Sequence, residues 1–599
     1  MIERRPLYRA VFCLMLHLII SGSVFSQPLS EFIAEEVDLD AVLDDLPETI
    51  DLSSATVKTL KDIPFFKPDS ARKIIAFRDS LSVEILGDRY AEIPGLTALE
   101  RIILSQLVAR QKTTVPSRFG ATLRQGVQYD PDDAPEDSRY YSRIQADDGT
   151  GVGVTILADR DPAEPKALDL LSYSMVKLFD GGRTKIVAGD YRHGFGQGVL
   201  MSRYGRAYGS GVDIMLYESQ KKMNTSFEET RFLRGLFLSH HRNRITTQTW
   251  YSFRRLDATL NDDGNAVTIR DTGYHRLDSE RENLKESIYG GRLRYDPSSD
   301  ASIGLTGMVT SYTPDLGRKS GESSYYDPAG STFRYLSIDG SMKHGPVELF
   351  YEHVLMNRNS KGAIAGATIS RPHVKGTLMY RRYEKDFRAY RAGAFSAFGS
   401  TSNERGVYSS IMVDLPANFR GIASMDMARL LYRTLTHPLP MSRRRINLVL
   451  YLPKTWSISS WMGYRSTDDS DNPSQRWNCR AGFERNRTGH KAFGVRSKIA
   501  YSASGDRGGP YGELTLLYRS HYIRCNLTGA VFDIPGYDAR FYRFEYNLPG
   551  RGYTRAVWGR GAAFIAVVKG GPLSLRYRFS NSDLMETSHL VGVQVDAGF

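Results

Sequence analysis

Apolar and polar side chains alternate with a period of two through most of residues 116–599. The alternation is clearest in four short runs, 446–452, 493–499, 542–547 and 573–579. Successive side chains of a β-strand point to opposite faces, so this period predicts strands that each have one apolar face. A soluble β-sandwich would alternate too, but about 480 residues of strand and turn are too many for one sandwich.

Composition narrows the choice further. The chain has 54 Gly, 35 Tyr and 27 Phe against 3 Cys, which is typical of large β-structures with aromatic girdles. Its 41% apolar and 24% charged residues are ordinary globular values, so collagen and disorder are excluded. A mean hydropathy of −0.37 excludes a helical membrane bundle. The net charge of +12 indicates anionic partners, whether lipopolysaccharide, nucleic acid or anionic solutes.

The C-terminus is the most specific signal. Counting back from Phe599, every second residue is apolar: Ala597, Val595, Val593 and Val591. This ending resembles the terminal strand of bacterial outer-membrane barrels, which ends in Phe and is read by the barrel-assembly machinery. The resemblance implies an outer-membrane location, with that machinery, outer-membrane lipid and lipopolysaccharide as partners. We therefore expect a mainly β fold, a large antiparallel transmembrane β-barrel of roughly 22–26 strands over residues 116–599.

The N-terminus has the parts of an export signal. Basic residues are followed by the apolar run 10–20 and by small residues up to Ser26. The run is too short to cross a bilayer comfortably, so we expect residues 1–26 to be a signal peptide cleaved before Gln27 rather than an anchor helix.

Residues 27–112 predict a small all-α domain in the periplasm. Ser53 or Ser54 suits the N-cap of its first helix, and Pro68 suits the first turn of the second. The expected helices lie near 55–63, 68–79, 82–91 and 97–109.

The helical pattern resembles the tandem helix-hairpin-helix domain of competence-type DNA receptors. The resemblance rests on the Leu-Ser-Ser-Ala start, on Leu60 and Ile63-Pro64, and on the apolar spacing of the second helix. It implies hairpins whose backbone N–H groups meet a phosphate, a contact that needs glycine. The two hairpins here, which lack most of those glycines, are Phe65, Phe66 and Lys67, and Gly95, Leu96 and Thr97. Two hypotheses stay open: DNA binding, and a degenerate hairpin domain that contacts another protein.

Two stretches interrupt the strand rhythm. The glycine-rich segment 189–200 has neither the spacing nor the context of a nucleotide-binding loop, so we expect backbone packed inside a lumen or folded across it. Such a segment after a helical region resembles a group of Gram-negative outer-membrane barrels that share this layout. The charged stretch 257–286 is expected to be an extracellular loop.

Inward-facing charge is the physical hint about a ligand. If the apolar face of each strand meets lipid, the opposite face lines the lumen, and Glu513 and Glu545 are the clearest acidic residues there. A positive lumen would attract phosphates, carboxylates or a nucleic-acid strand. The alternative is a closed lumen whose arginines pair with loop carboxylates and carbonyls or with a plug. The candidate anion-binding residues are Arg292, Arg294, Arg381, Arg480, Arg496, Lys498, Arg543, Arg576 and Arg578.

Catalysis has little support in the sequence. His193 lies near Asp190, and Tyr351-Glu352-His353 resembles a barrel phospholipase motif without its serine. Cys479 and Cys525 fall on separate strands, so we expect no disulfide, no metal site and no cofactor. We expect a non-enzymatic outer-membrane barrel that binds or conducts an anionic ligand, with a periplasmic helix-hairpin-helix domain for which DNA binding stays one of the two open hypotheses. The alternative is a structural or assembly-partner barrel with a closed lumen, whose helical domain docks another protein.

Overall fold

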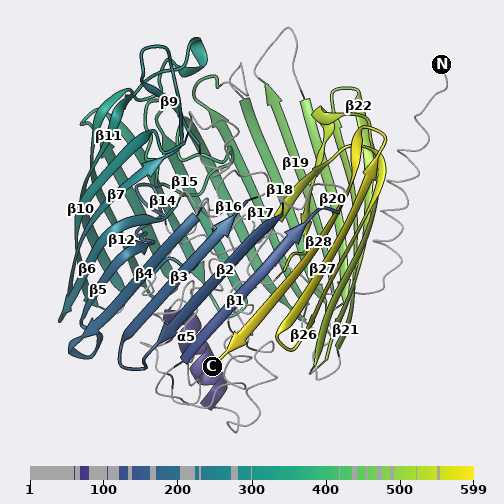
Figure 1. The fold of residues 1–599 in the computed structure, drawn as a ribbon, viewed down its shortest axis with the longest axis horizontal. Helices are drawn as coiled ribbons and strands as arrows, with labels where there is room; N and C mark the ends of the chain where they lie inside the picture. The colour runs from purple at the N-terminus through teal and green to yellow at the C-terminus, as the bar shows by residue number, and fades with distance from the viewer. Residues whose placement is uncertain are drawn as a thin grey trace.

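The fold is a closed β-barrel, seen in a computed structural model (Figure 1). The structure describes residues 55, 60, 68–79, 93, 104, 120–131, 138–161, 170–202, 223–227, 231–270, 281–298, 300–416, 419–434, 441–452, 456–467, 475–485, 492–520, 522–548 and 553–599. The expected signal segment 1–26 lies outside these residues. So do both expected hairpins, with Phe65, Phe66, Lys67, Gly95, Leu96 and Thr97.

One antiparallel sheet makes the barrel wall. Its 26 strands include the short β8 and β9, and the other 24 follow each other around the barrel in chain order. The first strand closes the barrel on the last, with Gln125 opposite Val595. The wall strands are β1 Gly120–Tyr129, β2 Arg139–Asp147, β3 Val152–Arg160, β4 Leu170–Phe179, β5 Thr184–Tyr191, β6 Leu233–Arg242, β7 Ile245–Leu256, β10 Leu284–Ser298, β11 Ala301–Leu316, β12 Gly330–His344, β13 Val347–Met356, β14 Ser360–Ser370, β15 Val374–Tyr383, β16 Glu404–Leu415, β17 Phe419–Leu430, β18 Met441–Leu452, β19 Trp456–Thr467, β20 Gln475–Arg485, β21 Ala492–Ser504, β22 Arg507–Arg519, β23 Ile523–Ile534, β26 Gly559–Gly570, β27 Leu573–Ser582 and β28 Met585–Gly598. The expectation of roughly 24 strands is confirmed.

Period-two alternation places apolar side chains outside, as β18 shows. Ile446, Leu448 and Leu450 are exposed on the outer face, whereas Asn447 and Val449 are buried on the inner face. The strands expected at 446–452, 493–499 and 573–579 are β18, β21 and β27. A barrel that turns its apolar side chains outward must meet lipid there, because water would penalise that surface.

The two ends of the barrel differ. Most turns at the end where β28 finishes are short, and the C-terminus and helix α5 lie there in Figure 1. The long connections 192–232, 384–403 and 535–558 all leave from the opposite end. We call this opposite end, from which the long connections leave, the loop end below.

The charged stretch 257–286, expected from the sequence to be an extracellular loop, starts after β7 at the loop end, but its last three residues, 284–286, belong to wall strand β10. Its described part forms a small hairpin, β8 Ala258–Leu260 with β9 Ala266–Ile269, which touches β11 through Ala266 opposite Leu316. Three short 3-10 turns complete the described chain: η4 Asp180–Gly182, η6 Glu322–Ser324 and η8 Tyr537–Ala539.

The longest described helical segment of the N-terminal region is α5, Pro68–Asp79, and the described residues Leu60 and Leu104 are also helical. The bounds of α5 are those expected, and Pro68 begins it because the missing N–H of proline costs nothing in a first turn. Ala71 and Ile74 are buried. Arg72 forms an ion pair of 3.4 Å with Asp300 in the turn between β10 and β11, so the helix is linked to the barrel. Among the described residues, no helix is long and apolar enough to span a bilayer.

The run 542–547 is not a wall strand, and this corrects the sequence prediction. It forms β24, Phe541–Glu545, which pairs only with β25, Tyr553–Val557, in a separate two-stranded sheet. Five residues are too few to cross a membrane as a strand, which takes about 9–11. Alternation recurs here because the hairpin also has two different faces.

Candidate functional site in the barrel lumen

A carboxylate of the wall holds the first inward segment, residues 192–202. Glu352 of β13 is wholly buried, and its Oε2 accepts the backbone N–H groups of Gln197 at 2.6 Å and Val199 at 3.0 Å. Its Oε1 accepts the N–H of Leu200 at 3.1 Å. Three backbone donors that would otherwise be orphaned inside the lumen are thereby satisfied. The expectation that the glycine-rich segment folds into the lumen is confirmed.

Glycine is required at the tightest point of this contact. Gly196 has a φ of +59°, and a Cβ there would lie 2.7 Å from Oε2 of Glu352. Any other residue would strain the backbone and push the carboxylate away.

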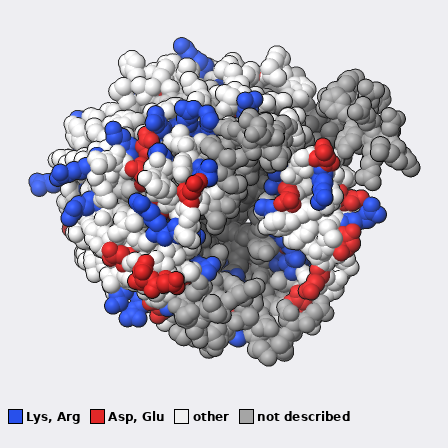
Figure 2. Space-filling view, turned by 90° about the horizontal axis from the view of Figure 1, so that it is seen from above, with Lys and Arg blue, Asp and Glu red and all other residues white. Residues whose placement is uncertain are grey.

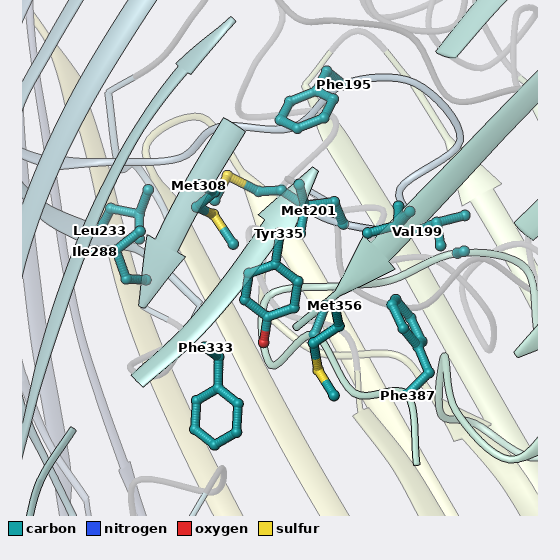
Figure 3. Packing of buried hydrophobic residues seen from close by; sticks show 14 of the residues in the cluster. Phe195, Val199, Met201, Leu233, Ile288, Met308, Phe333, Tyr335, Met356 and Phe387 are labelled. Carbon is teal, nitrogen blue, oxygen red and sulfur yellow. The ribbon is translucent and has the colours of Figure 1, made fainter. Parts of the chain in front are cut away.

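Apolar side chains pack the same segment against the wall. Phe195, Val199 and Met201 belong to a buried cluster with wall residues such as Tyr335 and Met308 (Figure 3). The ring of His193 lies 4.8 Å from Trp250 and 5.0 Å from Phe237, measured between ring centroids. Asp190, which the sequence placed near His193, forms an ion pair of 2.6 Å with Arg234. His193 therefore sits in a packed aromatic core, as an ordinary structural histidine does.

A second wall carboxylate holds the second inward segment, residues 384–403. Glu404 begins β16, and it accepts the N–H groups of Ala397 at 3.0 Å and Phe398 at 3.2 Å and the hydroxyl of Ser396 at 2.6 Å. The same carboxylate accepts Nε of Arg381 at 2.5 Å.

Arg381 is fully buried within this network. Its other contact is with Asp426 of β17 at 2.8 Å, and its guanidinium lies 4.8 Å from the ring centroid of Phe395. Removing the arginine would leave both carboxylates buried without their counter-charge, which is strongly destabilising. Arg292, another predicted site residue, makes a two-pronged pair with Asp339 at 2.5 and 2.9 Å and covers the ring of Phe195. Both arginines thus fix the wall and the inward segments.

The β24–β25 hairpin is the third inward element. Phe541 stacks on Tyr511 of β22 with ring centroids 4.5 Å apart. Glu545 accepts Arg543 at 2.8 Å and Arg576 of β27 at 3.0 Å, and both Arg543 and Glu545 are fully buried. Arg543 was expected on the lumen wall; it lies in the lumen, but on this hairpin.

Four more predicted site residues surround the hairpin. Arg480 of β20 lies 4.6 Å from the ring centroid of Phe541, and Lys498 of β21 lies 5.8 Å from it. Arg496 donates to the hydroxyl of Tyr546, just after β24. Arg578 of β27 donates to the hydroxyl of Ser588 at 2.9 Å. The remaining candidate, Arg294, is apart from this group: it pairs with Asp296 at 2.8 Å near the C-terminal end of the barrel.

Buried charge divides the described lumen into two unlike parts. Over residues 120–430 the buried cations are Arg143, Arg192, Arg254, Arg292, Lys375 and Arg381, and the buried carboxylates are Asp159, Asp190, Glu286, Asp339, Glu352, Glu404 and Asp426. Over residues 475–582 the buried cations are Arg496, Lys498, Arg543, Arg576 and Arg578, and the buried carboxylates are Glu513 and Glu545. The first part is nearly balanced, with six cations against seven carboxylates, and the second has five against two.

The balanced part corrects the expectation that few acidic residues face inward. Asp339, Glu352, Glu404 and Asp426 each occupy an inward position on a different strand. The alternation of inward and outward positions along each strand could have shown that these carboxylates point inward. It could not show which distant loop or arginine each of them contacts.

The loop end is hollowed near its middle, and Lys and Arg side chains gather around the hollow (Figure 2). The described residues contain no group of three or more His, Cys, Asp or Glu placed to hold a metal ion. Cys479 on β20 and Cys525 on β23 are free, with β21 and β22 between them.

The fold defines the class of protein. A closed antiparallel sheet pairs its backbone groups from strand to strand, and its apolar outer face meets lipid while its polar inner face lines a lumen. The protein is a transmembrane β-barrel with the strand architecture of outer-membrane barrels.

Comparisons with known proteins found similar solved structures but no match by sequence. No protein-family model matches the sequence, and no curated protein matches it. Among solved structures it is similar to Wzi of Escherichia coli, a carbohydrate-binding β-barrel involved in group 1 capsule assembly: 10% identity, 96% of this chain, 99% of that chain and a TM-score of 0.33. It is similar to the siderophore receptor PirA of Acinetobacter baumannii (8%, 81% of each chain, TM-score 0.38) and to OccK3 of Pseudomonas aeruginosa (9%, 80% of this chain, 95% of that chain, TM-score 0.28). Values this low carry no inference about ligands.

Proposed function

We propose that this protein is a non-enzymatic outer-membrane barrel that binds an anionic ligand in its lumen, reached from the loop end. The observation that carries the proposal is the charge imbalance around the β24–β25 hairpin, five buried cations against two carboxylates. Inside a lumen the effective dielectric constant is lower than in water, so a wall with more buried cations than carboxylates attracts anions strongly.

Arginine suits this role. Its planar guanidinium forms two parallel hydrogen bonds with a phosphate or carboxylate, which replace the hydration lost on binding. Glu545 already accepts Arg543 and Arg576, so a ligand would bind beside this pair, toward Arg496 and Lys498 on β21. Arg480 on the neighbouring β20 extends the same basic wall.

Binding of tripolyphosphate to the full-length protein, measured by calorimetry over a salt series, tests the proposal. We expect saturable binding that weakens as salt rises, and weaker binding in Arg496→Gln/Lys498→Gln. Lys375→Gln, a buried lysine in the balanced part, is the matched control and should bind as the wild type does. Equal binding by all three proteins would refute the lumen site.

A second candidate function is a closed structural barrel that docks a periplasmic protein. The Glu352 and Glu404 contacts favour it, since both hold chain inside the lumen. Planar-bilayer recordings separate the two: a closed barrel that also fails to bind tripolyphosphate supports the structural function.

We further propose that the N-terminal helical region is a periplasmic adaptor for DNA. The resemblance to competence-type DNA receptors motivates this, and helix α5, Pro68–Asp79, belongs to the region that carries the resemblance. Duplex and single-stranded DNA binding by the full-length protein should weaken steeply with salt. If the protein does not bind DNA at low salt, the adaptor instead contacts another protein.

A further inference from the structure

Three arginines form a row on the outer face of the barrel, near the loop end. Arg382 on β15, Arg405 on β16 and Arg429 on β17 are all exposed. The strand register sets Arg382 directly opposite Arg405, and Arg405 directly opposite Arg429. Neighbouring strands lie about 4.8 Å apart, so the three Cα atoms span only about 10 Å. We call Arg382, Arg405 and Arg429 the arginine row.

Such a row costs stability unless something neutralises it. Like charges directly opposite each other on neighbouring strands repel. Two further exposed cations lie close by. Arg444 on β18 is opposite Met427, one outward position from Arg429, and the backbone carbonyl of Lys361 on β14 accepts the backbone N–H of Glu384. Glu384 pairs with Arg382 at 2.9 Å and so offsets part of this charge.

Another pair of strands shows the usual arrangement. On β23 and β26, at the same end of the barrel, Arg560 lies directly opposite Asp533. The two form an ion pair of 3.0 Å on the exposed surface. In the arginine row, the position opposite an arginine is occupied by another arginine and not by a carboxylate such as Asp533. An anion from outside the protein can therefore act as the partner of these arginines.

An apolar belt lies directly beneath the arginine row. The next outward positions are Tyr380, Val407 and Met427, which are opposite one another in register and all exposed. The positions below them include Leu378 and Met425. A cationic row above an apolar belt complements a molecule with an anionic head and hydrocarbon chains.

From this charge and register we infer that the arginine row binds the phosphate groups of an anionic glycolipid in the extracellular leaflet. The phosphates lie between the guanidinium groups, where each arginine donates two hydrogen bonds. The acyl chains lie along Tyr380, Val407 and Met427. The bound phosphates relieve the repulsion between the arginines, and this relief favours binding. The same lipid fixes the depth of this side of the barrel in the membrane.

Binding of diphosphoryl lipid A to the full-length protein in detergent, measured by native mass spectrometry, tests the inference. Arg405→Gln removes the middle of the row and should weaken binding about fivefold. The triple variant Arg382→Gln/Arg405→Gln/Arg429→Gln should weaken it at least about tenfold. Arg560→Gln, an exposed arginine at the same end, is the matched control and should leave binding unchanged. Heat-modifiable electrophoretic migration shows whether each variant is folded. If the triple variant does not fold, Arg405→Gln alone tests the inference.

Three results would overturn the inference. Folded Arg405→Gln and triple variants that bind lipid A as tightly as the wild type would show that the row is not the site. Equal weakening by Arg560→Gln would show a general charge effect. Displacement of the lipid by millimolar inorganic phosphate would show a site for free anions. Weak binding of phosphatidylcholine, which carries no net charge, is expected alongside tight binding of lipid A.

Discussion

The carboxylate of Glu352 accepts the backbone N–H of Gln197 at 2.6 Å, although 155 residues separate the two in the sequence. One wall side chain thus determines where the glycine-rich segment lies. Glu404 repeats the arrangement with Ala397, seven residues away, in the second inward segment. In both cases the wall supplies a charged acceptor and the loop supplies backbone donors, so the lumen is occupied without leaving those donors unsatisfied.

Replacing Glu352 by glutamine should release the segment 192–202. The amide keeps one acceptor oxygen but points an N–H₂ donor at backbone donors, so we expect a loss of about 3 kcal/mol in the free energy of unfolding. Urea unfolding in lipid vesicles measures this, and planar-bilayer recordings should show higher conductance. Glu348→Gln, the same substitution near the other end of β13, is the control. Unchanged stability and conductance in Glu352→Gln would contradict the structural role of this carboxylate.

Replacing Arg381 by methionine should be more damaging. It leaves Glu404 and Asp426 buried without their cation, which costs about 3–5 kcal/mol. The triple variant Arg381→Met/Glu404→Gln/Asp426→Asn should recover part of this loss, because it removes the buried charges together. Arg382→Met, at the adjacent exposed position, is the comparison for the urea-unfolding midpoint. A triple variant less stable than Arg381→Met would show that the carboxylates stabilise the barrel by other contacts.

Gly196→Ala should destabilise the barrel more than Gly181→Ala. Both glycines have positive φ, +59° and +63°, so alanine at either position should cost about 1–2 kcal/mol in backbone strain. At Gly181 the new Cβ meets no atom within 4 Å, whereas at Gly196 it meets the Glu352 carboxylate. The difference between the two thermal unfolding midpoints therefore reports the close approach itself. Equal shifts would mean that the carboxylate moves away without cost.

Asp148, in the turn between β2 and β3, gives a pH-dependent prediction. Hydrogen bonds from the Thr150 hydroxyl and the Val152 N–H lower the pKa of Asp148 to about 2. A folded-state pKa below the unfolded value stabilises the protein at pH values above the unfolded pKa, about 3.9. The stability difference between wild type and Asp148→Asn should thus be constant from pH 7 to about pH 5 and shrink as the pH falls to 2. A difference that stays constant down to pH 2 would contradict it.

The wall of the barrel was largely predictable because local alternation encodes it. In β18 and β27 alternate residues are apolar, so a residue's position in this alternation indicates whether its side chain points outward or inward. Phe599 marks the end of the last strand. The helix at Pro68–Asp79 was predictable for a similar local reason, the position of its proline. The run 542–547 misled because a hairpin inside the lumen alternates as a wall strand does.

The sequence by itself determined a lipid-facing barrel of about 24 strands. The period of two, the approximate number of strands and the C-terminal strand that ends at Phe599 can all be recognised from residues that are neighbours in the sequence. Only the tertiary structure decided what fills the lumen and how the buried charges are distributed there. Glu352 meets residues 152 to 155 positions away, and Arg405 meets arginines of two other strands, because strand register brings together residues that no local pattern connects. Coulomb and hydrogen-bond energies depend on those distances in space, so the balance of the lumen and the cationic row outside it exist only once the barrel has closed.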